Sequence, residues 1–496
     1  MKPFQRTVIK ARSKANFIKQ QTLFTITALF TSLSVQATPT FSEDVQQYIT
    51  HQQNKIAFVN ATLIDGTGVE PKTAQTVVIE NGVISYVGSH NKSAVVDAEV
   101  VNLAGKTLIP GLILMHEHMF YPEITPNGLY HMTQQDYSFP RMYLAGGATS
   151  IRTAGGIEPE SDLRLKKYIN AGTMVGPKMD VTASYVEDIS RDPGFFTTQG
   201  SYLNGKEQVI DMMRFWHKRG TTSFKTYETV TRDEMKAAIA FAHDAGQKIT
   251  GHLCSVTFAE AAKMGIDNLE HGIYAASDFI KNKTPDECPS GMSNAMLNLD
   301  IKGKEVGQLI DTLVKHDVAI TSTLAVYEPS IYGRPPVYKE VLDSLAEPFR
   351  QSYKASWARV QKSKNKKQLV LFKKEMDFEK RFVEKGGRIM VGTDPTGSGG
   401  TIAGYSGMRA LELLAEAGFN TEQVIKIATL NAAQYMNSDA DIGSIALGKK
   451  ADMVVINGLL HKDMSNIRNI QWVFKEGIGY DSKRLFESVK GVVGLY

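Results

Sequence analysis

Two histidines stand two residues apart at the end of an apolar run. The segment LILMHEHMF covers residues 112–120 and places His116 and His118 on either side of Glu117. Side chains at alternate positions of a β-strand share one face, so a strand here would direct both imidazoles into one space. Neutral imidazole is a common ligand of divalent metal ions. Glu117 should point to the opposite face, where we expect it to satisfy a neighbour behind the strand.

Four more side chains suited to metal binding or proton transfer follow apolar runs later in the chain. They occur in the segments SFKTY, ITGHLC, NLEHG and IMVGTDP, and they are Lys225, His252, His271 and Asp394. A single histidine at a strand end is most often a packing or capping residue. If all these strands end at one face, however, four histidines and an aspartate suit zinc or a similar divalent ion. The chain has no CxxC motif, so a metal site would use histidine and carboxylate.

Residues 109–437 alternate between β-branched runs and amphipathic helical stretches. One such stretch, residues 231–246, begins with a threonine N-cap and ends with glycine. Strands each followed by helical sequence favour an α/β fold of the (β/α)8 TIM barrel type over an open doubly wound sheet. Barrel active sites lie at the carboxyl ends of the strands, where the six residues above would meet. The expected strands cover residues 109–116, 149–153, 178–182, 222–225, 248–252, 268–271, 318–324 and 388–392.

The two ends of the chain have a different sequence pattern from the middle. Residues 38–108 and 438–496 contain short alternating strands separated by glycine-containing turns such as ENG and ALGKK. Two β-rich ends that flank a long α/β middle predict one small β-sandwich domain built from both termini.

The first 37 residues are typical of a secretory signal peptide. Six basic residues and no acidic one precede an apolar segment at 22–35, and the small-x-small pattern VQA ends at Ala37. A single-span anchor is the alternative, but the apolar segment is shorter than the ~20 residues of a membrane helix. No later segment approaches that length. We therefore expect an exported protein, periplasmic or secreted, that keeps no membrane span after cleavage near Ala37.

Cleavage would also change the charge balance. The whole chain has 56 basic and 52 acidic residues, and loss of the six basic ones leaves 50 against 52. The mature chain would be slightly acidic, so its composition predicts no nucleic-acid partner.

The only two cysteines are Cys254 and Cys288. An oxidising compartment would permit a disulfide between them, but spacing alone does not place them within bonding distance. We expect two free or semi-buried thiols.

The motifs and their order resemble the amidohydrolase superfamily of metal hydrolases, in its binuclear subtype. The resemblance rests on IPGLILMHEH, GTTSFKTY, ITGHLCS, NLEHG and VGTDP, and on the sheet segment GKKADMVVING. It covers nearly all of the chain beyond residue 37, and the branch that it resembles most is the imidazolonepropionase-like and Xaa-Pro dipeptidase-like group. Each motif alone is weak, but their succession is specific.

The resemblance implies a role for each motif residue. His116, His118 and Asp394 would hold the more buried of two divalent metal ions, with zinc as the expected metal. His252 and His271 would hold the second ion. Lys225 would bridge both as N6-carboxylysine, a carbamate formed with CO2, because a protonated lysine does not ligate a cation. The alternative is an ordinary lysine that pairs with a substrate carboxylate.

The implied function is hydrolysis of peptide, N-acyl or cyclic amide bonds in small, dipeptide-like substrates. Two ions that share a water lower its pKa toward neutrality and give a bridging hydroxide. Asp394 would take the proton and pass it to the leaving amine. Hydrolysis of esters or lactones is an alternative, as is a catalytically inactive periplasmic binding protein. A single-metal deaminase fits less well, because Lys225 would then have no purpose.

Two further residues are candidates for substrate binding. Tyr227 shares a face with Lys225 and could donate to a developing oxyanion or hold a substrate carboxylate, or it could pack at the rim. Arg152, at the end of the second expected strand, could anchor a carboxylate or serve as a structural ion-pair partner. A homo-oligomer is compatible with the sequence.

Overall fold

The computed structural model describes residues 41–124, 130–187, 191, 203–396 and 399–496. The expected signal peptide, residues 1–37, lies outside this part of the chain, so its prediction stands as made. Among the described residues, no helix has the length and hydropathy needed to span a bilayer.

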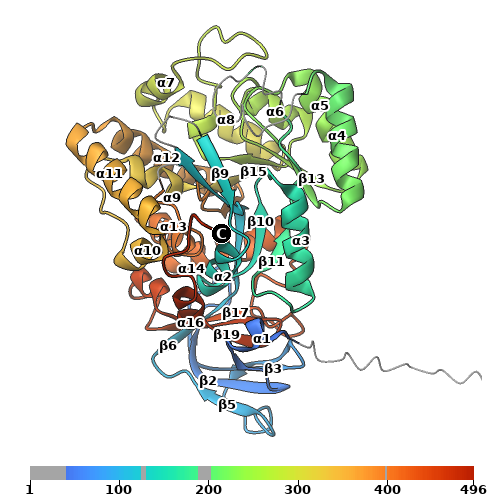
Figure 1. Ribbon diagram of the computed structural model, residues 1–496, viewed down its shortest axis with the longest axis vertical. Helices are drawn as coiled ribbons and strands as arrows, with labels where there is room; N and C mark the ends of the chain where they lie inside the picture. The colour runs from blue at the N-terminus through green and yellow to red at the C-terminus, as the bar shows by residue number, and fades with distance from the viewer. Residues whose placement is uncertain (1–40, 125–129, 188–190, 192–202, 397–398) are drawn as a thin grey trace, which may run out of the picture. The chain divides into compact units, whose positions relative to one another are not determined.

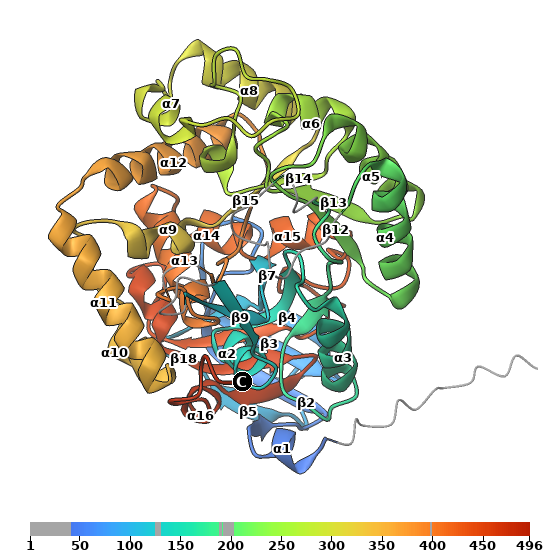
Figure 2. The same cartoon turned by 45° about the horizontal axis from the view of Figure 1, so that its top comes forward.

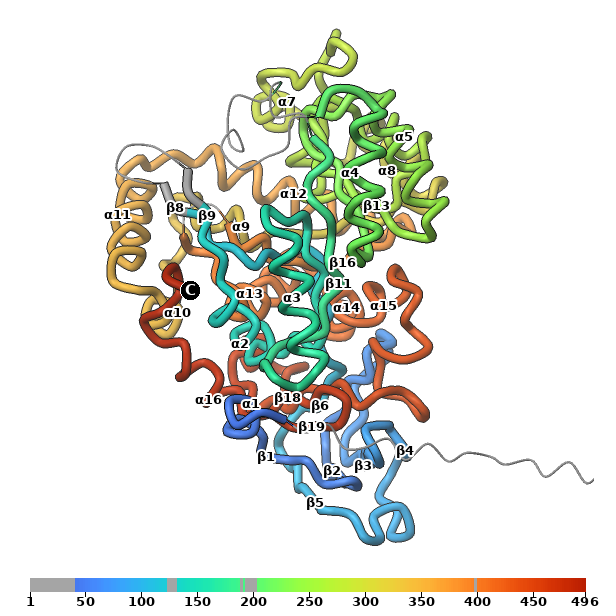
Figure 3. Tube along the Cα trace, turned by 45° about the vertical axis from the view of Figure 1, so that its right-hand side comes forward, coloured from blue at the N-terminus to red at the C-terminus, as the bar shows by residue number. Residues whose placement is uncertain are grey.

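Strands from both ends of the chain form one mixed sheet, as the alternating patterns predict. Within the described residues it has nine strands in the order β1-β19-β18-β17-β6-β2-β3-β4, with β5 beside β2. Figure 1 shows the blue N-terminal strands next to the red C-terminal ones, and Figure 3 shows β1 close to β19. The strands are β1 (Ile49–His51), β2 (Lys55–Leu63), β3 (Lys72–Glu80), β4 (Val83–Ser89), β5 (Glu99–Asn102), β6 (Lys106–Pro110), β17 (Met453–Asn457), β18 (Ile470–Lys475) and β19 (Ile478–Asp481).

Hydrogen bonds join the described strands of this terminal region into a single sheet. The sheet surrounds an apolar cluster to which strands from both termini contribute, including Phe58, Val77, Met453 and Phe474. Strand β6 continues to Pro110, so the N-terminal part of the sheet extends two residues past 108.

The described part of the chain contains eight parallel strands between these ends, each within or next to an expected range. They are β7 (Leu112–Glu117), β10 (Ala148–Thr153), β11 (Lys178–Asp180), β12 (Ser223–Thr226), β13 (Lys248–Gly251), β14 (Asn268–Glu270), β15 (Ala319–Ser322) and β16 (Ile389–Val391). Sheet pairing joins β11-β10-β7 and β12-β13-β14-β15-β16. Isolated bridges from Thr182 to Ser223 and from Val186 to Thr226 connect the two groups. At the other edge, the amides of Thr393 and Asp394 donate to the carbonyl of His116.

Helices lie outside the parallel strands, as Figure 2 shows for α4, α5, α6, α8 and α12 around β12–β15. The helix expected at 231–246 is α5, whose N-cap Thr231 forms a capping box with Glu234. The α-helices are α1 (Glu43–Gln46), α2 (Ser138–Ala145), α3 (Pro159–Asn170), α4 (Lys206–Arg219), α5 (Arg232–Asp244), α6 (Phe258–Met264), α7 (Met292–Asn298), α8 (Lys304–Lys315), α9 (Leu324–Tyr327), α10 (Lys339–Ser344), α11 (Glu347–Ser363), α12 (Lys367–Glu384), α13 (Tyr405–Glu416), α14 (Thr421–Ile427), α15 (Leu430–Tyr435) and α16 (Ser482–Glu487). Short 3-10 turns cover Gly272–Ala275, Glu328–Ser330 and Met464–Arg468, and β8 (Phe120–Ile124) pairs with β9 (Tyr130–Gln134) as a hairpin.

The two cysteines are bonded to each other, which corrects the expectation of free thiols. Cys254 follows β13 and Cys288 precedes α7, and their Cα atoms lie 4.8 Å apart. This separation is within the range that a disulfide requires. The turn that returns the chain over the end of β13 is a tertiary feature, so the spacing of 34 residues did not reveal the contact.

Replacing both cysteines with serine should lower the free energy of unfolding by about 2–4 kcal/mol, because the bond restricts the unfolded chain. Thermal unfolding with and without a reductant measures the effect. The reductant should lower the melting temperature of the wild type to that of the double variant, and it should leave the double variant unchanged. Equal melting temperatures of the oxidised wild type and the variant would contradict this expectation.

Candidate functional site

The six residues that the sequence singles out come together at the carboxyl ends of the parallel strands. His116 lies in β7 and Lys225 in β12, while His252, His271 and Asp394 follow strands β13, β14 and β16. His118 comes directly after β7. All six line a cavity of about 50 Å³ whose walls also include Phe120, Tyr185, Tyr227 and Thr396. The structure therefore assembles the whole expected set in one place.

Asp394 lies at the centre of this group. Its Oδ1 is 3.3 Å from Nε2 of His118 and 3.8 Å from Nε2 of His116, and its Oδ2 is 3.9 Å from Nδ1 of His271. Candidate ligand atoms of His116, His271 and Asp394 all lie within 4.8 Å of one another, close enough to meet one ion. The resemblance implies that His118 holds this ion with His116 and Asp394, and of the three histidines His118 lies nearest to Asp394.

The rings of the two HxH histidines are oriented by bonds on their far sides. Nδ1 of His116 donates to Oε2 of Glu270 at 2.8 Å, and Nδ1 of His118 donates to the carbonyl of Gly155 at 3.2 Å. These bonds leave each Nε2 directed at Asp394. A metal-binding histidine typically has such a partner on its other nitrogen, since it fixes the tautomer and the ring orientation.

The second pair of histidines lies beside the first. The ring centroids of His252 and His271 are 4.4 Å apart, and those of His116 and His271 are 4.7 Å apart. Nδ1 of His271 lies 2.7 Å from Oγ1 of Thr323, whereas Nε2 of His252 lies 3.1 Å from Oε1 of Glu228.

Burial sets the protonation states in favour of metal binding. Burial, with a further contribution from the charge of Lys225, lowers the pKa of His116 to about 4, and burial holds the pKa of His271 well below its usual range. Burial opposes the charge of Asp394, but His116 and the other nearby imidazoles hold its pKa well below its usual range. Neutral imidazoles around an ionised carboxylate form a donor set that fits divalent ions.

Lys225 is fully enclosed by this group. Its Nζ lies 3.4 Å from Nε2 of His116 and 5.5–5.6 Å from the ring centroids of Tyr185 and Tyr227. Burial lowers the pKa of this amine to about 8. A substantial fraction is therefore neutral near physiological pH, and the neutral amine is the form that can react with CO2.

Glu117 points away from the cavity, as strand alternation predicts. Its carboxylate accepts hydrogen bonds from the amide and the hydroxyl of Thr393, which follows the end of the neighbouring strand β16. Burial raises the pKa of Glu117 to about 8. Glu117 thus joins β7 to the segment that carries Asp394, and it is not part of the cavity wall.

Arg152 does not reach the cavity. Its Nη1 donates to the carbonyl of Met115 at 3.1 Å and to Oε1 of Glu270 at 3.3 Å, and its Nη2 donates to Thr250 at 2.9 Å. Of the two roles considered for Arg152, this geometry agrees with the structural ion pair and not with a substrate anchor. The side chain points from β10 into the space between the strands.

Tyr227 does line the cavity, with its ring 4.8 Å from that of His252 and 5.0 Å from that of Tyr185. Burial raises its pKa well above the usual range, so the hydroxyl keeps its proton and can donate. The contacts agree both with a donor to substrate and with a packing role.

Sequence patterns missed several groups at this site. Glu270 orients His116, and Glu228 bonds to His252, yet neither was singled out. Glu270 directly precedes His271, and in a regular strand the two side chains would point to opposite faces. His271 instead adopts a left-handed backbone with φ of 68°, and Asp394 does likewise with φ of 50°. Such strained positions concentrate at functional sites, and local propensity does not indicate them.

The hydrogen bond that His116 donates to Glu270 provides a test of the site. Replacing Glu270 with glutamine should weaken metal binding by roughly 10–100-fold, because His116 loses the charged partner that orients it. Competition with a chromogenic chelator measures the affinity, and thermal unfolding checks that the variant is folded. The matched control is Glu160→Gln, which changes an exposed partner of Arg219 and should leave metal affinity unchanged. Unchanged affinity in a folded Glu270→Gln protein would contradict this role.

Comparison with known protein families gives the same family that the sequence motifs resemble. A sequence model described as the Amidohydrolase family matches residues 107–479. No curated protein sequence matches the chain significantly.

Solved structures share the fold at low sequence identity. A Xaa-Pro dipeptidase with bound methionine in its active site is 20% identical with a TM-score of 0.65, over 86% of this chain and 100% of that one. Ochratoxinase from A. niger is 18% identical with a TM-score of 0.63, over 89% and 99%. Bottromycin amidohydrolase is 19% identical with a TM-score of 0.63, over 88% and 91%.

Proposed function

The chain belongs to the amidohydrolase family and is therefore a hydrolase of carbon–nitrogen bonds, and on this premise we propose that it cleaves amide bonds of small, dipeptide-like or N-acyl substrates with the help of two divalent metal ions. The observation that carries the proposal is the buried convergence of four histidines, Asp394 and Lys225 on one small cavity. The structural neighbours that are named as a Xaa-Pro dipeptidase, an ochratoxinase and a bottromycin amidohydrolase support the choice of substrate class.

In this proposal His116, His118, His252, His271 and Asp394 hold the metal, zinc being the expected ion. Lys225, as a carbamate formed with CO2, would add a carboxylate to this set of ligands. Divalent ions bound there would supply a hydroxide nucleophile at neutral pH and polarise the scissile carbonyl. The depressed pKa values of His116 and His271 support this assignment, because these two rings are already neutral when a ligand is needed.

The residues of the chain would perform the proton transfers. Asp394 is ionised at neutral pH, so it can accept a proton from the attacking water and pass it to the leaving amine. Tyr227 keeps its hydroxyl proton and can donate to the carbonyl oxygen as negative charge develops. Phe120 and Tyr185 form apolar walls that limit the access of bulk water.

We further propose that the eight parallel strands close as a (β/α)8 barrel, that residues 1–37 direct export, and that the mature protein is periplasmic or secreted. The bridges between β11 and β12 and the bonds between His116 and the segment after β16 support closure. The disulfide between Cys254 and Cys288 supports export, since such bonds persist in oxidising compartments.

A hydrolysis screen tests the function directly. Dipeptides and N-acyl amino acids are supplied with zinc and bicarbonate, and the release of free amine is measured beside metal analysis of the purified protein. We expect amide turnover, two equivalents of metal and a loss of turnover when CO2 is removed. Turnover of esters or lactones alone would favour that alternative. Absence of metal and of turnover would favour a binding protein.

Replacing Asp394 with asparagine should lower turnover at least about a thousandfold, because the proton acceptor is lost while four imidazoles still bind the metal. Metal content should change little by comparison. Steady-state kinetics on the best substrate from the screen, with metal analysis of the same sample, measures both. Near-normal turnover would rule out Asp394 as the group that moves the proton.

A further inference from the structure

The turn that follows β14 carries a candidate metal ligand on a strained backbone. His271 has a φ of 68° and the next residue, Gly272, has a φ of 57°, so two successive residues are left-handed. The chain then continues as the 3-10 segment Gly272–Ala275. Few non-glycine residues adopt a left-handed backbone, and the conformation persists only where the surrounding structure holds it. A group outside the turn therefore has to keep it in place.

Glu375 of α12 contacts this turn at two places. Its Oε2 accepts a hydrogen bond from the amide of Tyr274 at 3.1 Å. Its Oε1 lies directly against Gly272, where a Cβ atom would overlap with it. Only glycine at this position allows so close an approach. Glu375 is 1% exposed, on a helix that lies outside the parallel strands (Figure 2).

The carboxyl group of Glu375 is neutral at physiological pH. Burial, with a further contribution from the charge of Glu379, raises its pKa well above the usual range. Glu379 lies four residues later on the same face of α12 and is equally buried, at 1% exposure. A neutral carboxyl group still has a carbonyl oxygen that accepts a hydrogen bond from an amide. Glutamine has the same acceptor and nearly the same shape, whereas methionine is of similar length and has no comparable acceptor.

The other candidate ligand with a left-handed backbone has a similar partner. Asp394 has a φ of 50°, and the residue before it, Thr393, donates its amide to Glu117 at 2.9 Å. Glu117 is also fully buried outside the cavity, and burial raises its pKa. Each of the two strained ligands thus has, within three residues, a backbone amide that donates to a buried carboxyl group.

We propose that Glu375 is a positioning residue of the metal site, which holds the turn after β14 and so fixes where His271 meets an ion. This inference rests on the proposed function, in which His271 is a ligand. Glu375 is not among the residues that line the cavity, so it acts only through the turn. Thr323 acts on the ring, because its Oγ1 lies 2.7 Å from Nδ1 of His271. Glu375 acts on the backbone.

Three variants of α12 test this role through metal affinity, measured by competition with a chromogenic chelator. Glu375→Met fills the space without the acceptor and should weaken metal binding by about tenfold or more. Glu375→Gln keeps the acceptor and should stay within about threefold of the wild type. The absorption spectrum of the cobalt-loaded protein, which reports the geometry of the ligands, should change only in Glu375→Met.

Glu379→Met is the matched control. It removes an equally buried carboxyl group whose oxygens accept no hydrogen bond from residues 272–275, all of which the structure describes. Metal affinity should therefore be unchanged in this variant, even if its melting temperature falls. Thermal unfolding checks that every variant is folded. Glu375→Ala also lacks the acceptor, and it replaces Glu375→Met if that protein does not fold.

Unchanged metal affinity in a folded variant without the acceptor would overturn the proposal. An equal loss of affinity in Glu379→Met or in Glu375→Gln would overturn it as well, because the loss would then not follow the acceptor. A wild-type protein that binds no metal would reject the proposed function and this inference with it. Metal binding by the wild type therefore separates the failure of this inference from the failure of the proposed function.

Discussion

Glu270, His116 and Arg152 form a charged contact in the interior of the strands, and the geometry of the candidate site depends on it. All three side chains are at most 1% exposed, and both oxygens of Glu270 are used, Oε2 by His116 and Oε1 by Arg152. Burying a carboxylate is very unfavourable unless such partners are present. The contact therefore requires that β7, β10 and β14 keep one relative position. That position fixes the ring of His116, and with it the direction of the nitrogen that would meet a metal ion.

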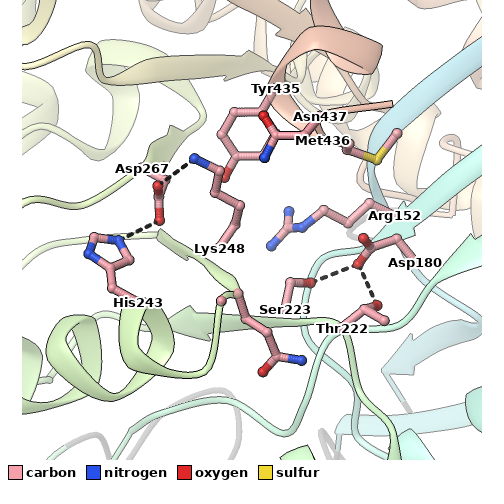
Figure 4. Close-up of a pocket in the computed structure, with 12 residues that line it drawn as sticks. Arg152, Asp180, Thr222, Ser223, His243, Lys248, Asp267, Tyr435, Met436 and Asn437 are labelled. Atoms are coloured by element: carbon pink, nitrogen blue, oxygen red, sulfur yellow. Dashed lines mark hydrogen bonds and ion pairs between the residues drawn. The ribbon is translucent and has the colours of Figure 1, made fainter. Parts of the chain in front are cut away.

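The same strands present different chemistry at their two ends. At the carboxyl ends, burial keeps the imidazoles of His116 and His271 neutral beside an ionised aspartate, and the one lysine among them is largely desolvated. At the amino ends, acidic and basic side chains lie in nearly equal number and partly pair with one another, as Figure 4 shows for Asp267 with Lys248 and His243. Two of the candidate ligands, His271 and Asp394, also adopt left-handed backbone. The surrounding packing has to stabilise these conformations, because only a few per cent of non-glycine residues have a positive φ.

Much of this arrangement follows from sequence alone, for identifiable reasons. The parallel strands are β-branched runs between helices, and strand alternation alone separated Glu117 from its two neighbours. The positions of the candidate ligands were predictable because each ends an apolar run. The partners of those ligands were not, since Glu270 meets His116 across strands distant in sequence, and Glu228 meets His252 only when β12 and β13 lie side by side. The direction of the long Arg152 side chain was not predictable either. Although Arg152 lies near the end of β10, its side chain reaches back toward the opposite end of the strands. The disulfide likewise depends on a turn that only the folded chain reveals.

The sheet built from both termini has a consequence for when the protein can fold. Strand β6 pairs along its whole length with β17, whereas its pairing with β2 involves only Thr107 and Leu108. Until the ribosome has made β17, the apolar edge of β6 has almost no partner. Contacts between segments so far apart in sequence form slowly. Until they form, an exposed strand edge can pair with another chain and lead to aggregation. Folding is therefore delayed until synthesis is nearly complete. If residues 1–37 direct export, as proposed, this delay is an advantage, because the polypeptide stays extended during passage across the membrane and completes its sheet on the far side.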